Sequence, residues 1–554
     1  MSPMAKFNSP LEAFLYWEKA TPDNPHFNQI LPGQTKTYTY RESGQEIRRM
    51  ASALKAYGYP EGSKVALISK NCAHWIMADI AIMMAGYISV PIYPTIGPDT
   101  IQHILEHSES KAIFLGKLDD YESQKSGIPK EVQKIGVRMF ETIDGDIWED
   151  LVEKNEPLEE MAEQVPDNLI TIIYTSGTTG LPKGVMHTIS NFNHMGNMTL
   201  DVFSMPKQTQ LFSYLPLSHI AERIGIEIQG TYRGACFTFP ESLDTFAANL
   251  AETQPHLFFA VPRIWSKFQE GVLTKMPQSK LDTLLKIPVI NGVIRKKIKK
   301  ALGLSRAKYI FSGAAPIAVS MMEWYQKLGI EVLQAYGMTE DCIHSHYNLP
   351  GQNRKGSVGK PIVGCEGKLS PDGEILLKAN GTMVGYYKME DKTKETITED
   401  GYLRTGDVGE YDHDGYLFIT GRVKDQFKTD KGKYIAPSPI ELELSKNPDI
   451  EQICVVGTGI PQPIALIVVS EEGKKKSKAE LSASLVDSIK EINPSLEKYE
   501  RLEKAIVMKE DWSVENGLLT PTMKVKRNQI EKIHMPYYTE WFDHSDLVIF
   551  EPLS

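Results

Sequence analysis

One segment of the chain combines residue types that suit phosphate binding. The segment TSGTTGLPKG, from Thr175 to Gly184, holds four hydroxyl side chains, three glycines and one lysine. Hydroxyls and backbone amides donate hydrogen bonds to phosphate oxygens, and lysine adds a positive charge. A Walker A loop is excluded, because Pro182 stands where its second glycine would be and proline has no N–H to donate. The composition alone also fits a polar surface turn, so this segment by itself does not identify a phosphate-binding loop.

Five further segments carry polar residues that a purely structural element would not need. They are LPLSHIAER (215–223), FSGAAP (311–316), QAYGMTED (334–341), YLRTGDVGEYDHDGYLFITGRVKD (402–425) and LLTPTMKVKR (518–527). In this order and spacing, the six segments resemble the motifs of the acyl-adenylate-forming (AMP-binding) superfamily. The resemblance covers about residues 10 to 535 and is strongest to long-chain fatty acyl-CoA synthetases. It implies two steps: a carboxylate and ATP give acyl-AMP and pyrophosphate, and the thiolate of coenzyme A then displaces AMP.

The resemblance also assigns roles to individual residues. It implies that Lys524, His219 and Lys183 are catalytic, with His219 beside the carboxylate substrate. It implies a Mg²⁺ ligand at Glu340, with Thr179 as a second candidate, a hinge at Lys424 and a coenzyme A face around Gly432. The ATP- and AMP-binding residues that it implies are Thr175, Ser176, Gly177, Thr178, Thr179, Gly180, Gly313, Ala314, Ala315, Tyr336, Gly337, Met338, Thr339, Asp407 and Arg422.

Within that set, the resemblance gives Tyr336 to adenine, Thr339 to the α-phosphate, and Asp407 and Arg422 to the ribose. An ionised carboxylate such as Asp407 offers two acceptor oxygens for two hydroxyls. Lys524 would stabilise the charge that accumulates when a carboxylate attacks the α-phosphorus. Taken alone, Lys524 could also belong to a solvated basic run, since Lys526 and Arg527 follow it.

Composition limits the class of protein. With 554 residues the chain is too long for one core, and we expect three to four structural units. The net charge of −10 argues against nucleic-acid binding. Five scattered cysteines without a CxxC pair predict neither disulfides nor zinc, and the N-terminus lacks a signal-peptide pattern. We therefore expect a cytoplasmic protein.

Apolar strand-sized runs alternate with helical patterns along most of the chain. The expected strands are 65–69, 112–115, 170–174, 257–261, 309–312 and 332–335. Such alternation predicts an α/β fold with parallel sheets and helices on both faces. With the resemblance, we expect a large N-terminal domain of α/β layers (1–421), including a small barrel-like β-subdomain near 340–421. A small, mobile α+β C-terminal domain (422–554) would follow.

Three other patterns suggest different functions. The apolar run 75–93 is long enough to span a membrane, but Gly86 and Pro91 divide it into a buried helix and strand, which we prefer. The turn at 412–415 lacks the twelfth-position glutamate of a calcium loop, so a hairpin is expected. Cys342, His344 and His346 would share one face of a strand, either as metal ligands or as an ordinary strand beside polar residues.

The segment 284–304 combines apolar residues with Arg295, Lys296, Lys297, Lys299 and Lys300. A basic amphipathic helix of this kind can lie on anionic lipid, and we predict weak peripheral membrane association. A homodimer, known among long-chain members of the superfamily, is left open. The alternatives for function are a fatty acyl-AMP ligase that uses a carrier protein, a medium-chain or aryl-CoA ligase, and a catalytically silent acyl-binding protein.

Overall fold

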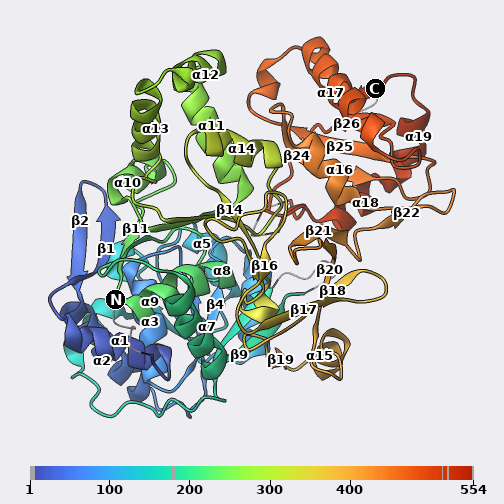
Figure 1. The fold of residues 1–554 in the computed structure, drawn as a ribbon. Coiled ribbons are helices and arrows are strands. Elements are labelled where there is room, and N and C mark those ends of the chain that lie inside the picture. Colours follow the sequence, from blue (N-terminus) through green and yellow to red (C-terminus); the bar gives the residue numbers. More distant parts are fainter. Residues whose placement is uncertain (1–5, 176–180, 515, 521–522, 552–554) are drawn as a thin grey trace.

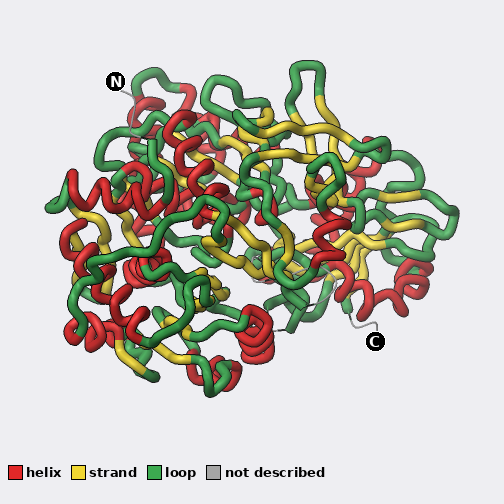
Figure 2. The backbone as a smooth tube through the Cα atoms, turned by 90° about the horizontal axis from the view of Figure 1, so that it is seen from below, coloured by secondary structure: helices red, strands yellow, loops and turns green. Residues whose placement is uncertain are grey.

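The computed structural model describes residues 6–175, 181–514, 516–520 and 523–551 (Figure 1). Several sheets and their covering helices build a large N-terminal part, and a smaller C-terminal unit follows. Figure 1 shows this unit, in orange and red, on the side opposite helix α1 (Pro10–Ala20). Figure 2 shows the same backbone from below, with helices in red and strands in yellow. The fold-class prediction, an α/β protein with a C-terminal α+β unit, is confirmed.

The largest sheet has eight strands in the order β19-β9-β8-β4-β3-β5-β6-β7. Strands β8, β4, β3, β5, β6 and β7 are parallel, whereas β9 and β19 pair antiparallel at one edge. The expected strands 65–69, 112–115 and 170–174 all lie in this sheet, because apolar runs of this kind can be buried on both faces. The bounds are β19 (Gly385–Tyr386), β9 (Lys183–Thr188), β8 (Leu169–Thr175), β4 (Ile88–Ile92), β3 (Lys64–Ile68), β5 (Ala112–Leu115), β6 (Gln133–Gly136) and β7 (Asp146–Ile147).

The apolar run 75–93 folds as a helix and a strand of this sheet. Helix α3 (Ala73–Met84) is buried along its whole length, Gly86 takes a left-handed φ of 80°, and β4 follows. The preferred interpretation from the sequence is therefore confirmed. Within the described ranges, no helix is long and apolar enough to cross a membrane.

The one charge in that apolar run, Asp79, forms a buried ion pair with Arg223. Arg223 opens a π-helical turn (Arg223–Ile228), and its Nη2 donates to Asp79 Oδ2 at 2.6 Å. Its Nε donates to Glu227 at 3.2 Å and its Nη1 to the Thr171 hydroxyl at 2.9 Å. Arg223 and Asp79 are both fully buried. The LPLSHIAER segment is thereby bound to α3 and to β8.

Two smaller sheets lie against the first. One has the order β10-β11-β1-β2, and the other, β12-β13-β14-β15-β16, contains the expected strands 257–261, 309–312 and 332–335. Their bounds are β10 (Gln210–Phe212), β11 (Cys236–Phe239), β1 (Pro25–Leu31), β2 (Gln34–Thr39), β12 (Leu257–Ala260), β13 (Tyr309–Ser312), β14 (Leu333–Tyr336), β15 (His346–Tyr347) and β16 (Lys360–Pro361).

Helices cover these sheets. They are α2 (Tyr40–Ala56), α4 (Pro98–Ser108), α5 (Tyr121–Gln124), α6 (Trp148–Lys154), α7 (Ile189–Val202), α8 (Ile220–Glu222), α9 (Gln229–Arg233), α10 (Phe246–Thr253), α11 (Pro262–Lys275), α12 (Gln278–Lys286), α13 (Ile290–Ala301), α14 (Val319–Lys327) and α15 (Glu390–Thr396). A separate apolar cluster under α11 and α14, with Phe258 and Trp265 in its centre, gives that region its own core.

Beyond Cys365 the chain changes to antiparallel strands, as expected from its short apolar runs. The order is β17-β18-β20-β21. Asp412 at the β20–β21 turn accepts bonds from the backbone N–H groups of Asp414 and Tyr416, which confirms the hairpin. The bounds are β17 (Cys365–Leu369), β18 (Glu374–Ala379), β20 (Leu403–Tyr411) and β21 (Leu417–Arg422).

The C-terminal unit has a four-stranded sheet, β24-β25-β26-β27, and a two-stranded ribbon, β22-β23. The chain beyond the last motif forms part of it: α19 buries Trp541, and β27 pairs parallel to β26. The tail therefore completes the sheet, a role that the motifs did not indicate. The bounds are β22 (Phe427–Lys428), β23 (Tyr434–Ile435), α16 (Pro437–Leu444), β24 (Ile450–Val456), β25 (Ile464–Val469), α17 (Lys478–Ile492), β26 (Lys504–Val507), α18 (Arg527–His534), α19 (Tyr538–Asp543) and β27 (Val548–Phe550).

The buried pair gives a stability prediction. Asp79→Ala should lower the free energy of unfolding by about 3 to 5 kcal/mol, because it leaves the Arg223 charge buried without its closest partner. Asp23→Ala is the matched control: Asp23 pairs with Arg41 at 2.9 Å, but both side chains are exposed, so the loss should stay below about 1 kcal/mol. Urea unfolding of both variants measures the difference, and equal losses would contradict it.

Candidate active site

Asp407 connects strand β14 of the five-stranded sheet to the β20–β21 hairpin. Asp407 and Arg422 lie directly opposite each other in the β20–β21 register, and Arg422 Nε donates to Asp407 Oδ1 at 2.7 Å. Tyr336, at the end of β14, donates its hydroxyl to Asp407 Oδ2 at 2.6 Å. The Asp407 charge raises the pKa of Arg422, and burial together with that charge raises the pKa of Tyr336. The Asp407 carboxylate thus joins the segment 334–341, which holds Tyr336, to the segment 402–425, which holds Asp407 and Arg422.

Glu340 lies in a second group with Lys183. The Tyr386 hydroxyl, from β19, donates to Glu340 Oε1 at 2.8 Å, and Lys183 Nζ lies 4.3 Å from the centre of the Tyr386 ring. Burial lowers the pKa of Lys183, and the Glu340 charge acts against that shift. Tyr386 could not be found from the sequence, because its position beside Glu340 depends on the β9–β19 pairing at the sheet edge.

His187 fixes the backbone of the TED segment. His187 Nε2 donates to the Thr339 carbonyl at 2.7 Å, so this nitrogen carries the ring proton. The thiol of Cys342 lies 3.2 Å from the other ring nitrogen, Nδ1, which is then an acceptor. Burial lowers the pKa of His187 to about 4, which keeps the ring neutral near pH 7. His187 is a second supporting residue that the motif order did not reveal.

The metal interpretation of Cys342, His344 and His346 is wrong. Cys342 and its neighbour Ile343 take left-handed φ angles of 54° and 55°, so the expected strand does not include them. His344 donates to the Val363 carbonyl at 2.8 Å, whereas His346 bonds to the Tyr411 hydroxyl at 2.9 Å. Among the described residues, no three His, Cys, Asp or Glu side chains are grouped so that they could hold a metal ion.

Lys524 reaches this region from the C-terminal unit. Burial and the Arg422 charge lower the pKa of Lys524, and the charges of Asp407 and Glu340 raise it. Residue 524 is itself solvent-exposed, but protein groups on several sides remove part of the hydration of its ammonium. Charges interact measurably only over short separations in salt solution. Lys524 is therefore near both carboxylates.

His219 lies near the same lysine. His219 is the N-cap of α8, where its Nδ1 accepts a bond from the Ala221 N–H at 3.2 Å. Burial, and then the Lys524 charge, lower its pKa to about 4, so the ring is neutral near pH 7. A capped helix start fixes the ring orientation. The Lys524 charge acts on His219, so the two side chains lie near each other.

Small residues follow directly after β13 and β14. A Cβ at Gly313 would lie 2.9 Å from the Phe259 ring and 3.1 Å from the Ala335 carbonyl oxygen, and Ala314 takes a left-handed φ of 64°. A Cβ at Gly337 would lie 2.5 Å from Ile343 Cα. Close approach of backbones therefore requires glycine at both places. Ala315 is exposed beside them.

Part of the predicted set lies outside the described residues, namely Ser176, Gly177, Thr178, Thr179 and Gly180. Thr175 and Lys183, which flank them, are paired across β8 and β9. The charge of the predicted hinge residue, Lys424, acts on Lys183, which places it near the same group. Gly432 lies on the exposed turn between β22 and β23, with a φ of 77°.

Glu222, three residues after His219, is a buried carboxyl that the sequence did not single out. Its Oε1 accepts bonds from the Ser213 hydroxyl at 2.8 Å, the Tyr214 N–H at 2.9 Å and the Asn71 amide at 3.3 Å. Burial raises its pKa to about 8. The group is therefore largely protonated at neutral pH.

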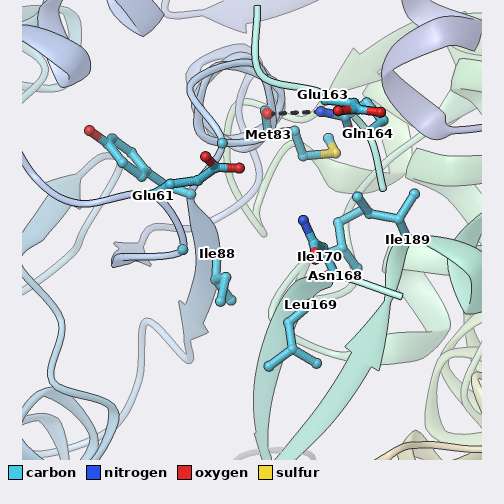
Figure 3. A pocket seen from close by; sticks show the side chains of 12 residues that line it. Glu61, Met83, Ile88, Glu163, Gln164, Asn168, Leu169, Ile170 and Ile189 are labelled. Carbon is cyan, nitrogen blue, oxygen red and sulfur yellow. Dashed lines mark hydrogen bonds between the residues drawn. The ribbon is translucent and has the colours of Figure 1, made fainter. Parts of the chain in front are cut away.

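A separate cavity of about 370 Å³ lies at the amino ends of strands β4 and β8 in the largest sheet (Figure 3). Ile88 and Leu169, at the starts of β4 and β8, line it, and Gln164 donates across it to the Met83 carbonyl. Ligands of open parallel sheets bind at the carboxyl ends of the strands. Thr175, at the carboxyl end of β8, marks the candidate active site at the opposite edge.

Comparison with known proteins identifies the same family as the sequence motifs. Residues 14–387 match the family model for AMP-binding enzymes, and residues 424–539 match the model for the AMP-binding enzyme C-terminal domain. Long chain acyl-CoA synthetase 6, peroxisomal, from Arabidopsis thaliana is 31% identical, over 90% of this chain and 80% of its own. Long-chain-fatty-acid–CoA ligase ACSBG2 from Xenopus laevis is 29% identical, over 90% of this chain and 78% of its own.

Solved structures share the fold. The adenylation domain of a carboxylate reductase from Mycobacterium chelonae has a TM-score of 0.80 at 23% identity, covering 97% of this chain and 91% of that one. The anthranilate CoA ligase AuaEII, solved with anthranoyl-AMP, has a TM-score of 0.79 at 20% identity, covering 97% of this chain and 99% of that one. At these identities the likeness establishes the fold.

The Glu222 carboxyl predicts a pH dependence of stability. Its pKa rises from an ordinary value of 4.5 to about 8 in the folded protein. Across that window the folded state keeps a proton that the unfolded state releases, so the free energy of unfolding falls as pH rises. Glu222→Gln keeps an acceptor oxygen and cannot ionise. From pH 5 to pH 8 it should therefore lose about 1 to 4 kcal/mol less than the wild type in urea unfolding. Parallel pH curves for the two proteins would contradict this assignment.

Proposed function

Because the chain belongs to the AMP-binding enzyme family, we propose that it activates a long-chain fatty acid in two steps. The carboxylate attacks the α-phosphorus of ATP, which gives acyl-AMP and pyrophosphate. The thiolate of coenzyme A then attacks the acyl carbon, and AMP leaves. The observation that carries the proposal is the Asp407 carboxylate, which accepts bonds from Tyr336 and Arg422 and whose charge, with that of Glu340, also acts on Lys524.

In this proposal Lys524 acts in the first step. Negative charge grows on the phosphoryl and bridging oxygens as the carboxylate attacks. An ammonium about 4 Å from that charge, at an effective dielectric near 20, supplies on the order of 4 kcal/mol before desolvation is subtracted. The neighbouring charges of Asp407 and Glu340 favour the protonated form that this role needs. His219, neutral beside it, would face the carboxylate substrate without repelling the incoming ammonium.

The nucleotide would lie along the Asp407 group. Each carboxylate oxygen of Asp407 accepts one bond in the structure, from Tyr336 and from Arg422. A carboxylate oxygen has room for a second donor, so ribose hydroxyls can be added. Tyr336 would offer its ring to adenine, and Thr339 its hydroxyl to the α-phosphate. Gly313, Ala314 and Ala315 leave space beside them.

Glu340 fits the role of a Mg²⁺ ligand. Magnesium in nucleotide sites is commonly held by one or two carboxylates, with phosphates and water completing the octahedron. The described residues offer no larger cluster of ligands, which agrees with that pattern. When bound, the ion would neutralise phosphate charge. The oxygens of Glu340 would hold it, with Tyr386 orienting the carboxylate through its bond to Oε1.

For the second step we propose that the C-terminal unit, from residue 422 on, turns about Lys424. The turn would withdraw Lys524 and bring the face around Gly432 to the acyl group. A carrier-protein thiol in place of coenzyme A is the main alternative acceptor. The choice of long-chain fatty acids rests on the names of the relatives, which are long-chain acyl-CoA ligases.

The direct test is product release across carboxylic acids from acetate to oleate. With ATP, Mg²⁺ and coenzyme A, we expect AMP and pyrophosphate to appear at rates that increase with chain length. With coenzyme A left out, turnover should stop after about one equivalent of pyrophosphate. Preference for short or aromatic acids would keep the mechanism and contradict the substrate. Absence of turnover with every acid would contradict the function.

We also propose that the α12–α13 corner binds anionic membranes weakly. Val289 and Val293 there are 82% and 61% exposed, and Val289 holds a positive φ of 69°, which is costly for a β-branched residue. Strained positions cluster at functional sites. Of the five basic residues, Lys296, Lys297 and Lys300 are exposed, whereas Arg295 donates to the Lys327 carbonyl. Figure 1 shows α12 and α13 at the upper edge of the molecule, away from the largest sheet.

Vesicle sedimentation tests the membrane proposal. The wild type should bind vesicles that contain phosphatidylserine and should not bind vesicles of phosphatidylcholine alone. Val289→Asp should weaken this binding about tenfold, because a charge replaces an inserting side chain. Leu243→Asp is the matched control, since Leu243 is 85% exposed but stands between acidic residues. Equal binding by the wild type and by a variant with Lys296, Lys297 and Lys300 changed to glutamine would contradict the proposal.

A further inference from the structure

An ion pair joins the C-terminal unit to the N-terminal part at a point away from the linker. Arg263 Nη2, in the first turn of α11, lies 2.5 Å from Glu451 Oε1, near the start of β24. The two side chains are 45% and 31% exposed. Figure 1 shows α11 in the green part of the chain and β24 in the orange part, on neighbouring sides of the molecule.

The helix itself does not explain an arginine at this place. Arg263 follows Pro262, which occupies the first position of α11. The N-terminus of a helix carries partial positive charge, so a cation there is unfavourable for the helix. A carboxylate brought by another element offsets that cost. Glu451, from the C-terminal unit, supplies this charge.

Other charged groups surround the pair. Burial, then the charges of Glu451 and Glu472, raise the pKa of Glu270 on α11, and Lys267 and Arg263 act in the opposite direction. Glu472, also in the C-terminal unit, forms its own pair with Lys475 at 2.5 Å. Carboxylates of the C-terminal unit thus face both cations and one carboxyl group of α11, and the Arg263–Glu451 pair acts against the repulsion between Glu270 and Glu451.

The pair and the linker hold the C-terminal unit at two separate points. The linker leaves β21 at Arg422, which pairs with Asp407, and the Asp407 charge also acts on Lys524. A single flexible connection would let the unit turn, whereas a second contact restricts its orientation. We propose that Arg263 and Glu451 are positioning residues, which favour the arrangement with Lys524 in the active site. This inference rests on the proposed function.

The expected effect is modest. Exposed ion pairs contribute about 0.2 to 1 kcal/mol, which corresponds to a shift of up to about fivefold in an equilibrium. Loss of the pair should therefore slow acyl-AMP formation by about two- to fivefold. The second step does not use Lys524, so its rate should stay the same or increase.

The experiment separates the two steps in the full-length chain. Acyl-AMP formation is measured as pyrophosphate exchange into ATP with palmitate and no coenzyme A. The second step is measured from synthetic palmitoyl-AMP and coenzyme A. Arg263→Gln and Glu451→Gln should each slow only the first step. The exchanged pair, Arg263→Glu with Glu451→Arg, should restore at least half of the lost rate.

Arg138→Gln is the matched control, because Arg138 and Asp150 form an exposed pair of similar length, 2.6 Å, within the N-terminal part. It should leave both rates unchanged. The inference is overturned if Arg263→Gln leaves the first step unchanged, if it slows both steps equally, or if the exchanged pair restores nothing. A wild type without pyrophosphate exchange for any acid contradicts the proposed function itself, so the two failures are distinguishable.

Discussion

The Asp407 carboxylate is the constraint on which the candidate site depends. One oxygen accepts from Tyr336 and the other from Arg422, so the end of β14 and the β20–β21 hairpin share one anion. The carboxylate is nearly buried, at 7% exposure, and a buried charge is stable only with such partners. Strand β21 ends at Arg422, and the chain continues from there toward the C-terminal unit. The same carboxylate therefore contacts the last residue of β21, and its charge acts on Lys524 from the C-terminal unit.

A second set of buried charged residues links helix α3 to strand β8 of the largest sheet. Arg223 reaches Asp79 on α3 and Thr171 on β8, and it follows directly after Glu222. The LPLSHIAER segment thus presents His219 toward Lys524 while its last residues anchor in the interior. Arg223 and Glu222 are almost fully enclosed, and each has several partners. Polar residues in that motif therefore have two roles. His219 lies at the candidate site, whereas Glu222 and Arg223 stabilise the interior, and the spacing of the residues in the sequence does not distinguish these roles.

The sequence predicted the strands well, because runs such as 65–69 and 309–312 are apolar enough to be buried on both faces. It also predicted that Lys524, Glu340 and Asp407 belong together, although only through resemblance to a family. Tyr386 and His187 could not be found, since their partners, Glu340 and Thr339, lie 46 and 152 positions away in the chain and only the tertiary fold brings them together. The strand expected at Cys342 failed because two successive left-handed residues turn the backbone there. Alternating residue types do not reveal such a turn.

The central claim is that Lys524 acts on the α-phosphorus. The most direct measurement is single-turnover formation of acyl-AMP from ATP and palmitate, without coenzyme A, by Lys524→Ala beside Lys526→Ala. The account predicts a loss approaching a thousandfold for Lys524→Ala, with ATP affinity little changed, and a nearly normal rate for Lys526→Ala. Acyl-AMP formation at the wild-type rate by Lys524→Ala, or an equal loss in both variants, would contradict it.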